Sequence, residues 1–394
     1  MLRDYLVAYF QTLVSSPHQD RIQLTIVDGF CGGGRYLNEA GDAVPGSPLV
    51  ILQALNEALA RIHASQQRRK PLDMDVLLIC IDEDRSAVDH LRGVLEEEGH
   101  GEALRRERIR LLTGTFVAHA DAVLRCAAER SPRSGRALFV LDQYGYDAVP
   151  VGNLAAIFRR LKTAEILLTF GVDSLITFLD PKNLADFERK TGINGAVSAE
   201  DLDKTLRDAT WRVRIQSGLY RRLTTGSGAK HFTPFFIRPA RGHGDFWLLH
   251  LSQHWKARDV MAATHWQHQN HFAHYGGAGF DMLSTGYAAK IDEEGPQAMF
   301  EFDDAAARMS LSTMQDQIPR LLVDRPDGVI FDEFFAERSN TTPATKAMVE
   351  QTVLGLVREK EVEIVGLDGK VRNVRTALQS DHVVRLRAQR RFVF

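Results

Sequence analysis

A glycine-rich loop that follows an apolar run constrains the fold of this 394-residue chain more than any other feature. The apolar run at residues 23–27 ends at Asp28, and Gly29-Phe30-Cys31-Gly32-Gly33-Gly34 comes next. This pattern predicts a buried parallel strand that opens into a tight turn, where glycines let the backbone approach a ligand closely. A carboxylate in such a loop would repel phosphate, but it suits a cation or a ribose hydroxyl. S-adenosylmethionine offers both groups.

Two other nucleotide-binding motifs fit the loop less well. A dinucleotide fingerprint has a third glycine where this chain has Leu37. A P-loop ends in a lysine, and none follows Gly34. A glycine-rich turn that binds no ligand stays open as the simplest alternative.

Polar residues also follow the later apolar runs of the first half of the chain. These runs, at residues 75–82, 108–113, 137–142 and 165–170, alternate with helical patterns. The alternation predicts a doubly wound parallel sheet, in which the carboxyl ends of the strands share one edge and bind ligands there. We therefore expect Asp28, Asp82, Thr115 and Asp142 on one rim. Asp82 is placed to accept two ribose hydroxyls, although an acidic residue here could also complement a helix dipole.

Other segments complete a first domain, predicted over residues 1–290. An amphipathic helix at 2–13 covers the sheet, and Ser47 and Ser86 are expected to cap later helices. The segment 37–46 could fold over a ligand, and the charged helical stretch at about 180–230 is typical of an inserted lid. Residues 232–238 and 245–251 are expected to pair as antiparallel final strands.

A second domain is predicted over residues 300–394, after glycine and proline breaks at about 276–300. Helical patterns at 303–322, 331–338 and 343–359 precede a hairpin with the turn Asp368-Gly369 and a closing strand at 383–387. Three helices followed by a hairpin indicate a winged helix-turn-helix. Its basic residues suit the phosphates of RNA or DNA, with a protein-docking winged helix as the alternative. The candidate contacts are Lys346, Arg372, Arg375, Arg385 and Arg387.

Composition excludes several classes of protein and site. The net charge of -2 requires any nucleic-acid surface to be local. Three cysteines without a C-x-x-C motif argue against a zinc site or a disulfide framework and favour a cytoplasmic protein. No apolar run is long enough to span a membrane, and the first residues do not have the layout of a signal peptide. The series His265, His268, His271 and His274 is expected on a polar helical surface rather than in a metal site.

Taken together, these motifs resemble the three-Cys-motif partner protein family. The matching pieces are residues 28–36, 46–49, 141–145 and 165–179, the strand that ends at Asp82, and the winged helix. The family looks like a class I S-adenosylmethionine-dependent methyltransferase with a Rossmann-like sheet, and its members are named for a neighbouring protein with a three-cysteine motif. More distantly, the layout is similar to a ribosomal RNA adenine-N6 methyltransferase family. The resemblance implies that S-adenosylmethionine is held by Asp28, Gly29, Cys31, Gly32 and Gly34, with Asp82 and Glu83 at the ribose and Thr115 near the adenine.

The resemblance also places Asp142-Gln143-Tyr144-Gly145 where amino-methylating enzymes carry D-P-P-Y. In that motif the acid orients the target amine and the aromatic ring stacks on the flipped base, which gives Asp142 and Tyr144 the catalytic roles. Gln143 and Gly145 depart from the motif, while either Tyr144 or Tyr146 could stack on the base. Two functions therefore stay open: a methyltransferase for a nucleic-acid base amino group, and a non-catalytic partner protein that binds DNA or a neighbouring protein. A dehydrogenase fits less well because Leu37 replaces a glycine.

Overall fold

The structure is a computed structural model, and it describes residues 1–14, 16–38, 40–65, 68, 70–202, 211–237, 246–268, 272–275, 278–281, 299–301, 303–342 and 344–387. The contacts between these residues divide the chain into two units, Met1–Thr264 and His265–Phe394. Residues 282–298, which include most of the predicted boundary region, lie outside the described residues.

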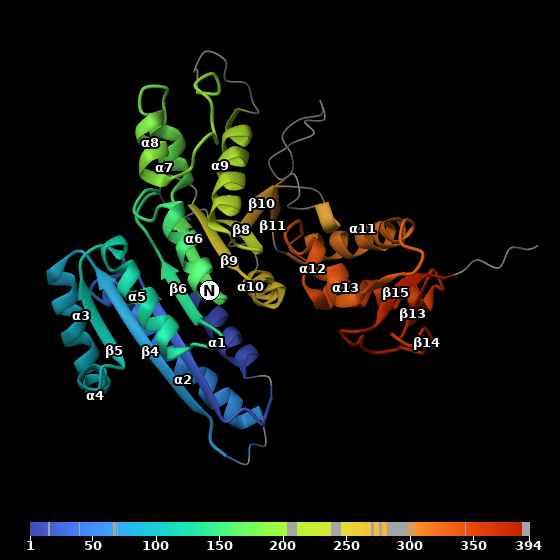
Figure 1. The fold of residues 1–394 in the computed structure, drawn as a ribbon, viewed down its shortest axis with the longest axis horizontal. Helices are drawn as coiled ribbons and strands as arrows, with labels where there is room; N and C mark the ends of the chain where they lie inside the picture. Colours follow the sequence, from blue (N-terminus) through green and yellow to red (C-terminus); the bar gives the residue numbers. More distant parts are fainter. Residues whose placement is uncertain are drawn as a thin grey trace, which may run out of the picture. The chain divides into compact units, whose positions relative to one another are not determined.

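A mostly parallel sheet forms the centre of the first unit (Figure 1). Its strands are β1 (Arg21–Asp28), β4 (Asp73–Asp82), β5 (Ile109–Thr113), β6 (Arg136–Leu141), β7 (Thr163–Phe170), β8 (His231–Ile237) and β9 (Phe246–Ser252). Within this unit their order is β8-β9-β7-β6-β1-β4-β5. The five strands from β7 to β5 run parallel, and β9 runs antiparallel to both of its neighbours, β7 and β8. The predicted mixed α/β fold and the antiparallel final strands are confirmed.

The central strands are buried on both faces, which is why they read as continuous apolar runs in the sequence. In β1, Leu24, Ile26 and Val27 are all fully buried. The parallel register places Asp28 opposite Cys80 of β4 and Val140 of β6. The carboxyl ends of these three strands therefore lie within two residues of one another along the same edge.

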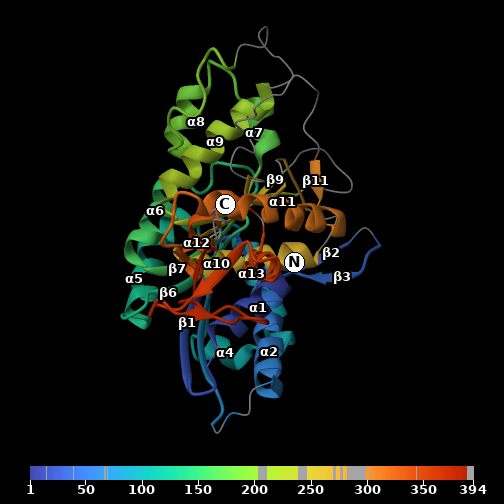
Figure 2. The ribbon, with the colours of Figure 1, turned by 90° about the vertical axis from the view of Figure 1, so that its right-hand side faces the viewer.

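Helices cover both faces of this sheet. The helices of the unit are α1 (Leu2–Leu13), α2 (Ser47–Ser65), α3 (Arg85–Glu97), α4 (Gly101–Arg105), α5 (Phe116–Arg130), α6 (Val151–Arg160), α7 (Val172–Phe178), α8 (Leu184–Thr191), α9 (Trp211–Ser227) and α10 (Trp255–Gln267), of which α7 and α8 lie beyond the carboxyl ends of the strands (Figure 1). The first two pack together, and α6 packs against both α5 and α9. Figure 2 shows α5 and α6 on one side of the strands and α1 and α2 on the other.

Local details of the first unit follow from capping and turn chemistry. The prediction that Ser86 caps α3 is wrong: Asp84 is the cap, and its carboxylate accepts the Ser86 amide at 2.8 Å. A carboxylate at this position also complements the helix dipole. The segment after the glycine loop forms a small hairpin of β2 (Arg35–Leu37) and β3 (Ala43–Pro45).

The second unit contains the winged helix. Its elements are β10 (Phe272–Tyr275), the 3-10 helix η2 (Gly279–Asp281), β11 (Met299–Glu301), α11 (Asp304–Leu322), β12 (Val329–Ile330), α12 (Phe331–Arg338), α13 (Lys346–Arg358), β13 (Val362–Val365), β14 (Val371–Arg372) and β15 (Val383–Leu386). The order β12-β15-β13-β14 gives three helices beside a small antiparallel sheet. The predicted hairpin is present, and Gly369 adopts the left-handed conformation that its turn requires, with φ of 76°.

The expected helical surface of histidines does not form. His265 is fully buried near the end of α10, while His274 lies on β10. His271 lies outside the described residues. In the described part of the chain, no helix is long and apolar enough to cross a membrane.

Candidate active site at the strand tips

The glycine loop follows β1 and is fixed to the tips of the two flanking strands by backbone hydrogen bonds. The Gly29 amide donates to Val140 O of β6 at 2.9 Å, and the Cys31 amide donates to Ile81 O of β4 at 3.0 Å. Gly32 adopts a φ of 54°, and a Cβ there would lie 1.9 Å from the Tyr36 hydroxyl. The left-handed conformation favours glycine at this position, and any larger residue would also displace the Tyr36 hydroxyl.

Asp82 holds the same loop through its side chain. One of its carboxylate oxygens accepts the Gly32 amide at 2.8 Å, and the other accepts the Asp84 amide at 3.0 Å. A carboxylate has about four acceptor positions, so two remain for ligand hydroxyls. Glu83 is exposed immediately beside it. Asp82 therefore stabilises the loop. It also lies at the strand tip where a ribose was predicted to bind.

Asp28 is a fully buried carboxylate at the tip of β1. Its Oδ1 accepts the Phe30 amide at a long 3.4 Å, while Oδ2 is buried and has no hydrogen-bond partner among the described residues. Burial raises the pKa of Asp28 to about 7, and the Ser47 hydroxyl and the Phe30 amide lower it only in part. The negative charges of Asp142 and Asp82 raise it further. A buried carboxylate oxygen without a donor is an uncompensated cost that a cationic ligand would offset.

Thr115 and Asp142 follow the tips of β5 and β6. Thr115 is the N-cap of α5, and its hydroxyl accepts the Ala118 amide at 3.2 Å. Asp142 is exposed, and its Oδ1 accepts a 2.6 Å hydrogen bond from the Thr169 hydroxyl of β7. The structure therefore brings Asp28, Asp82, Thr115 and Asp142 to one edge of the sheet, although Thr115 already uses its hydroxyl in capping.

The loop after Asp142 is closed by the side chain of Gln143. Gln143 is buried, and its Oε1 accepts the Val149 amide at 3.0 Å, so it closes the turn. Tyr144 is 99% exposed. Tyr146 packs instead against Phe170 and Phe187, with ring centroids 6.3 and 6.0 Å away. Of the two tyrosines, the free one is Tyr144, which remains the predicted stacking residue.

A cavity of about 370 Å³ adjoins Asp142 on the face of the sheet that carries α1 and α2. Apart from Asp142, Thr169 and Ser47, its walls are apolar: Met1, Leu2, Val140, Leu167, Phe246 and Leu248. Its volume lies in the range of small-molecule sites. Sequence reasoning did not assign Leu167 or Leu248 to a site, because both lie in strands that read as core.

The site contains acidic and hydroxyl groups but no recognisable metal centre. Across the described ranges, no group of three or more His, Cys, Asp and Glu side chains could hold a metal ion. The carboxylate acceptors at the strand tips suit hydroxyl, amine and cationic groups of an organic ligand.

In the winged helix, three of the five candidate cations already have anionic partners. Lys346 pairs with Asp332 at 2.5 Å and also lies over the Phe331 ring. The other two paired cations are Arg372, 2.8 Å from Asp368, and Arg385, 2.7 Å from Glu363.

Arg375 and Arg387 are exposed and have no ion-pair partner among the described residues. These two arginines are therefore the cations most available to phosphate.

The strand order gives the first unit a sheet like that of class I methyltransferases. Numbered along the chain, the seven strands of its sheet lie in the order 3-2-1-4-5-7-6, with the seventh antiparallel. A family model described as the GMT-like wHTH domain matches residues 286–369. The chain therefore carries a methyltransferase-like sheet and a C-terminal winged helix-turn-helix.

Comparison with solved structures gives distant likenesses. Protein LPL1258 from Legionella pneumophila str. Philadelphia 1 is 11% identical over 64% of this chain and 84% of its own, with a TM-score of 0.34. An O-methyltransferase from Bacillus cereus in complex with SAH is 13% identical over 62% of this chain and 80% of its own, with a TM-score of 0.29. SMU.1697c from Streptococcus mutans, also in complex with SAH, is 14% identical over 63% of this chain and 95% of its own, with a TM-score of 0.28. At TM-scores below 0.5 these likenesses identify no activity for this chain. No curated protein matches its sequence.

Proposed function

We propose that this chain is an S-adenosylmethionine-dependent methyltransferase that modifies an amino group of a nucleic-acid base. The observation that carries the proposal is the buried Oδ2 of Asp28, which has no donor among the described residues and lies beside a glycine loop. S-adenosylmethionine carries an ammonium and a sulfonium, and either positive charge would offset the cost of ionising this carboxylate. When bound, the cofactor would supply an activated methyl group.

Each residue at the strand tips has a role in this proposal. Asp28 and the loop of Gly29, Cys31, Gly32 and Gly34 hold the methionine end. Asp82 and Glu83 accept the ribose hydroxyls, and Thr115 lies toward the adenine. These residues would contribute by binding and orienting the cofactor relative to the methyl acceptor.

Asp142 holds the methyl acceptor in this proposal. Its Oδ1 is oriented by the Thr169 hydroxyl, which leaves Oδ2 to accept a hydrogen bond from an amine in the adjoining cavity. The apolar walls of that cavity suit the faces of a planar base, and Tyr144 stacks on the base when it enters. The winged helix contributes phosphate contacts through Arg375 and Arg387.

A second function is favoured by specific observations. Tyr144 is 99% exposed, Gln143 is committed to closing its own loop, and Lys346 is paired with Asp332. These features suit a non-catalytic partner protein whose winged helix binds DNA or a protein, such as the three-cysteine-motif neighbour that the sequence resemblance implies.

Two measurements test the proposal. Calorimetry with S-adenosylmethionine should detect binding that Asp28→Ala and Asp82→Ala abolish; binding that both variants retain would refute the pocket assignment. Transfer of a labelled methyl group to total RNA and DNA should then be lost in Asp142→Ala but kept in Asp147→Ala, which removes an exposed carboxylate of the same loop. Cofactor binding without transfer to either nucleic acid would favour the partner protein.

A further inference from the structure

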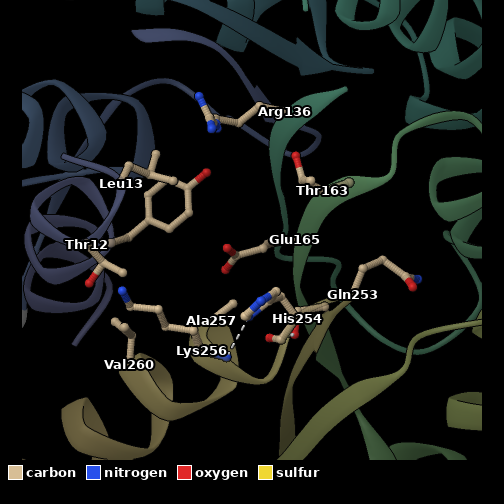
Figure 3. Close-up of a pocket in the computed structure, with 13 residues that line it drawn as sticks. Thr12, Leu13, Arg136, Thr163, Glu165, Gln253, His254, Lys256, Ala257 and Val260 are labelled. Atoms are coloured by element: carbon tan, nitrogen blue, oxygen red, sulfur yellow. Dashed lines mark hydrogen bonds between the residues drawn. The ribbon is translucent and has the colours of Figure 1, made fainter. Parts of the chain in front are cut away.

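A second cavity, of about 280 Å³, lies at the opposite end of the sheet from the strand tips. It is bounded by the second half of α1, the first residues of β6 and β7, the end of β9 and the start of α10. Figure 3 shows side chains from these elements around one hollow, with the Glu165 carboxylate directed into it. All of these residues belong to the first unit.

Two cations line this cavity without an anionic partner. Figure 3 shows Arg136 and Lys256 on opposite sides of the hollow, with Glu165 between them. In the described part of the chain, neither cation forms an ion pair within 4.0 Å, whereas Arg3, Arg21 and other arginines of the unit do. His254 also lines the cavity. The two separated positive charges are therefore available to acidic groups of a ligand.

Glu165 offers the cavity a hydrogen-bond acceptor, and Tyr9 lies beside it. Glu165 takes its described hydrogen bonds on Oε2, from the Tyr5 hydroxyl and from Nε2 of His250 at 3.1 Å. Its Oε1 has no partner among the described residues. Tyr9 also lines the cavity and is 97% buried, and its buried hydroxyl has no hydrogen-bond partner in the described part of the chain. Buried polar groups of this kind are costly unless a ligand or water satisfies them.

We infer that this cavity binds a small acidic α-amino or α-hydroxy acid with two carboxylates. One carboxylate pairs with Arg136 and the other with Lys256, while the amino or hydroxyl group donates to Oε1 of Glu165. The apolar wall formed by Leu13, Ala164, Ala257 and Val260 receives the carbon chain. The formal charge of Arg136, Lys256 and Glu165 together is +1, so an acidic amino acid with a net charge of -1 neutralises the site, while a hydroxy acid dianion leaves it with one negative charge.

Calorimetric titration with L-aspartate, L-malate and succinate tests the inference directly. L-aspartate and L-malate should bind, and succinate, which has the same carbon chain without the donor, should bind more weakly. Arg136→Gln and Lys256→Gln should each weaken binding by on the order of tenfold or more, because each removes a charge-assisted contact. Arg159→Gln removes an exposed cation from α6 and should leave binding unchanged.

Three outcomes would overturn the inference: none of the acids binds, succinate binds as well as L-malate, or Lys256→Gln binds as the wild type does. Lys256 is exposed, so its replacement should leave the fold intact, which a thermal melt checks. S-adenosylmethionine binding measured on the same variants separates this site from the strand tips. It should be unaffected by Lys256→Gln, and the acid site does not depend on whether the cofactor binds.

Discussion

Replacing Asp28 with asparagine should remove a pH-dependent cost from the folded chain. The side chain is fully buried, and its pKa rises from 3.8 to about 7 on folding. Because the folded pKa is the higher one, the folded state binds the proton more tightly than the unfolded chain does. The stability linked to this proton is fully present below about pH 4 and is lost as pH rises through about 7.

The magnitude follows from the two pKa values. The full shift corresponds to about 4 kcal/mol, and most of it is lost above the folded pKa. Between about pH 5 and about pH 8, the free energy of unfolding of the wild type should fall by roughly 2–3 kcal/mol relative to that of Asp28→Asn. The variant has no titrating group here, so all other titrations cancel in the comparison.

Urea denaturation at the two pH values, without any ligand, measures this difference. Asp121→Asn, which replaces a carboxylate that is 80% exposed, should follow the wild type at both pH values. If Asp28→Asn and the wild type show parallel pH dependence, Asp28 does not carry a raised pKa. The electrostatic argument for a cationic ligand would then fail.

Three further predictions concern the proposed sites. S-adenosylmethionine binding near pH 6.5 should release roughly 0.7 proton as Asp28 ionises, measured by calorimetry in buffers of different ionisation enthalpy; equal heats in all buffers would contradict this. Thr169→Val should lower the rate of methyl transfer by about tenfold, because Asp142 loses its orienting hydrogen bond, while cofactor affinity measured in parallel stays constant. Arg375→Gln should reduce the salt dependence of nucleic-acid binding, so that the slope of log K against log salt concentration changes by about 0.9. A larger effect from Arg385→Gln would contradict the assignment of Arg375 as an available cation and Arg385 as a paired one.

The sheet could be predicted because its central strands have no exposed face. Residues 75–82 are apolar for most of their length and residues 23–28 for half of it. Parallel strands must end at a common edge, so the meeting of Asp28 with Asp82 followed from topology. The hairpin of the winged helix could also be predicted, because the turn Asp368-Gly369 is a strong local signal.

Contacts between distant segments could not be predicted in the same way. Tyr5 and His250 reach Glu165 across 160 and 85 residues, and no local pattern brings them together. The pairing of Lys346 with Asp332 was missed because both residues look like ordinary surface charges in sequence. Asp82 was predicted to bind a ligand. Its hydrogen bond to the Gly32 amide could not be predicted, because that bond depends on the conformation of the loop.

The position of β9 between β7 and β8 has a consequence for biosynthesis. β7 ends at Phe170 and β8 at Ile237, yet each pairs with a strand that begins only at Phe246. On a ribosome, β7 therefore emerges with one edge open and β8 without its neighbour until translation has passed residue 252. Open strand edges invite pairing with other chains. Nascent chains halted between these two points should be the ones most dependent on chaperones.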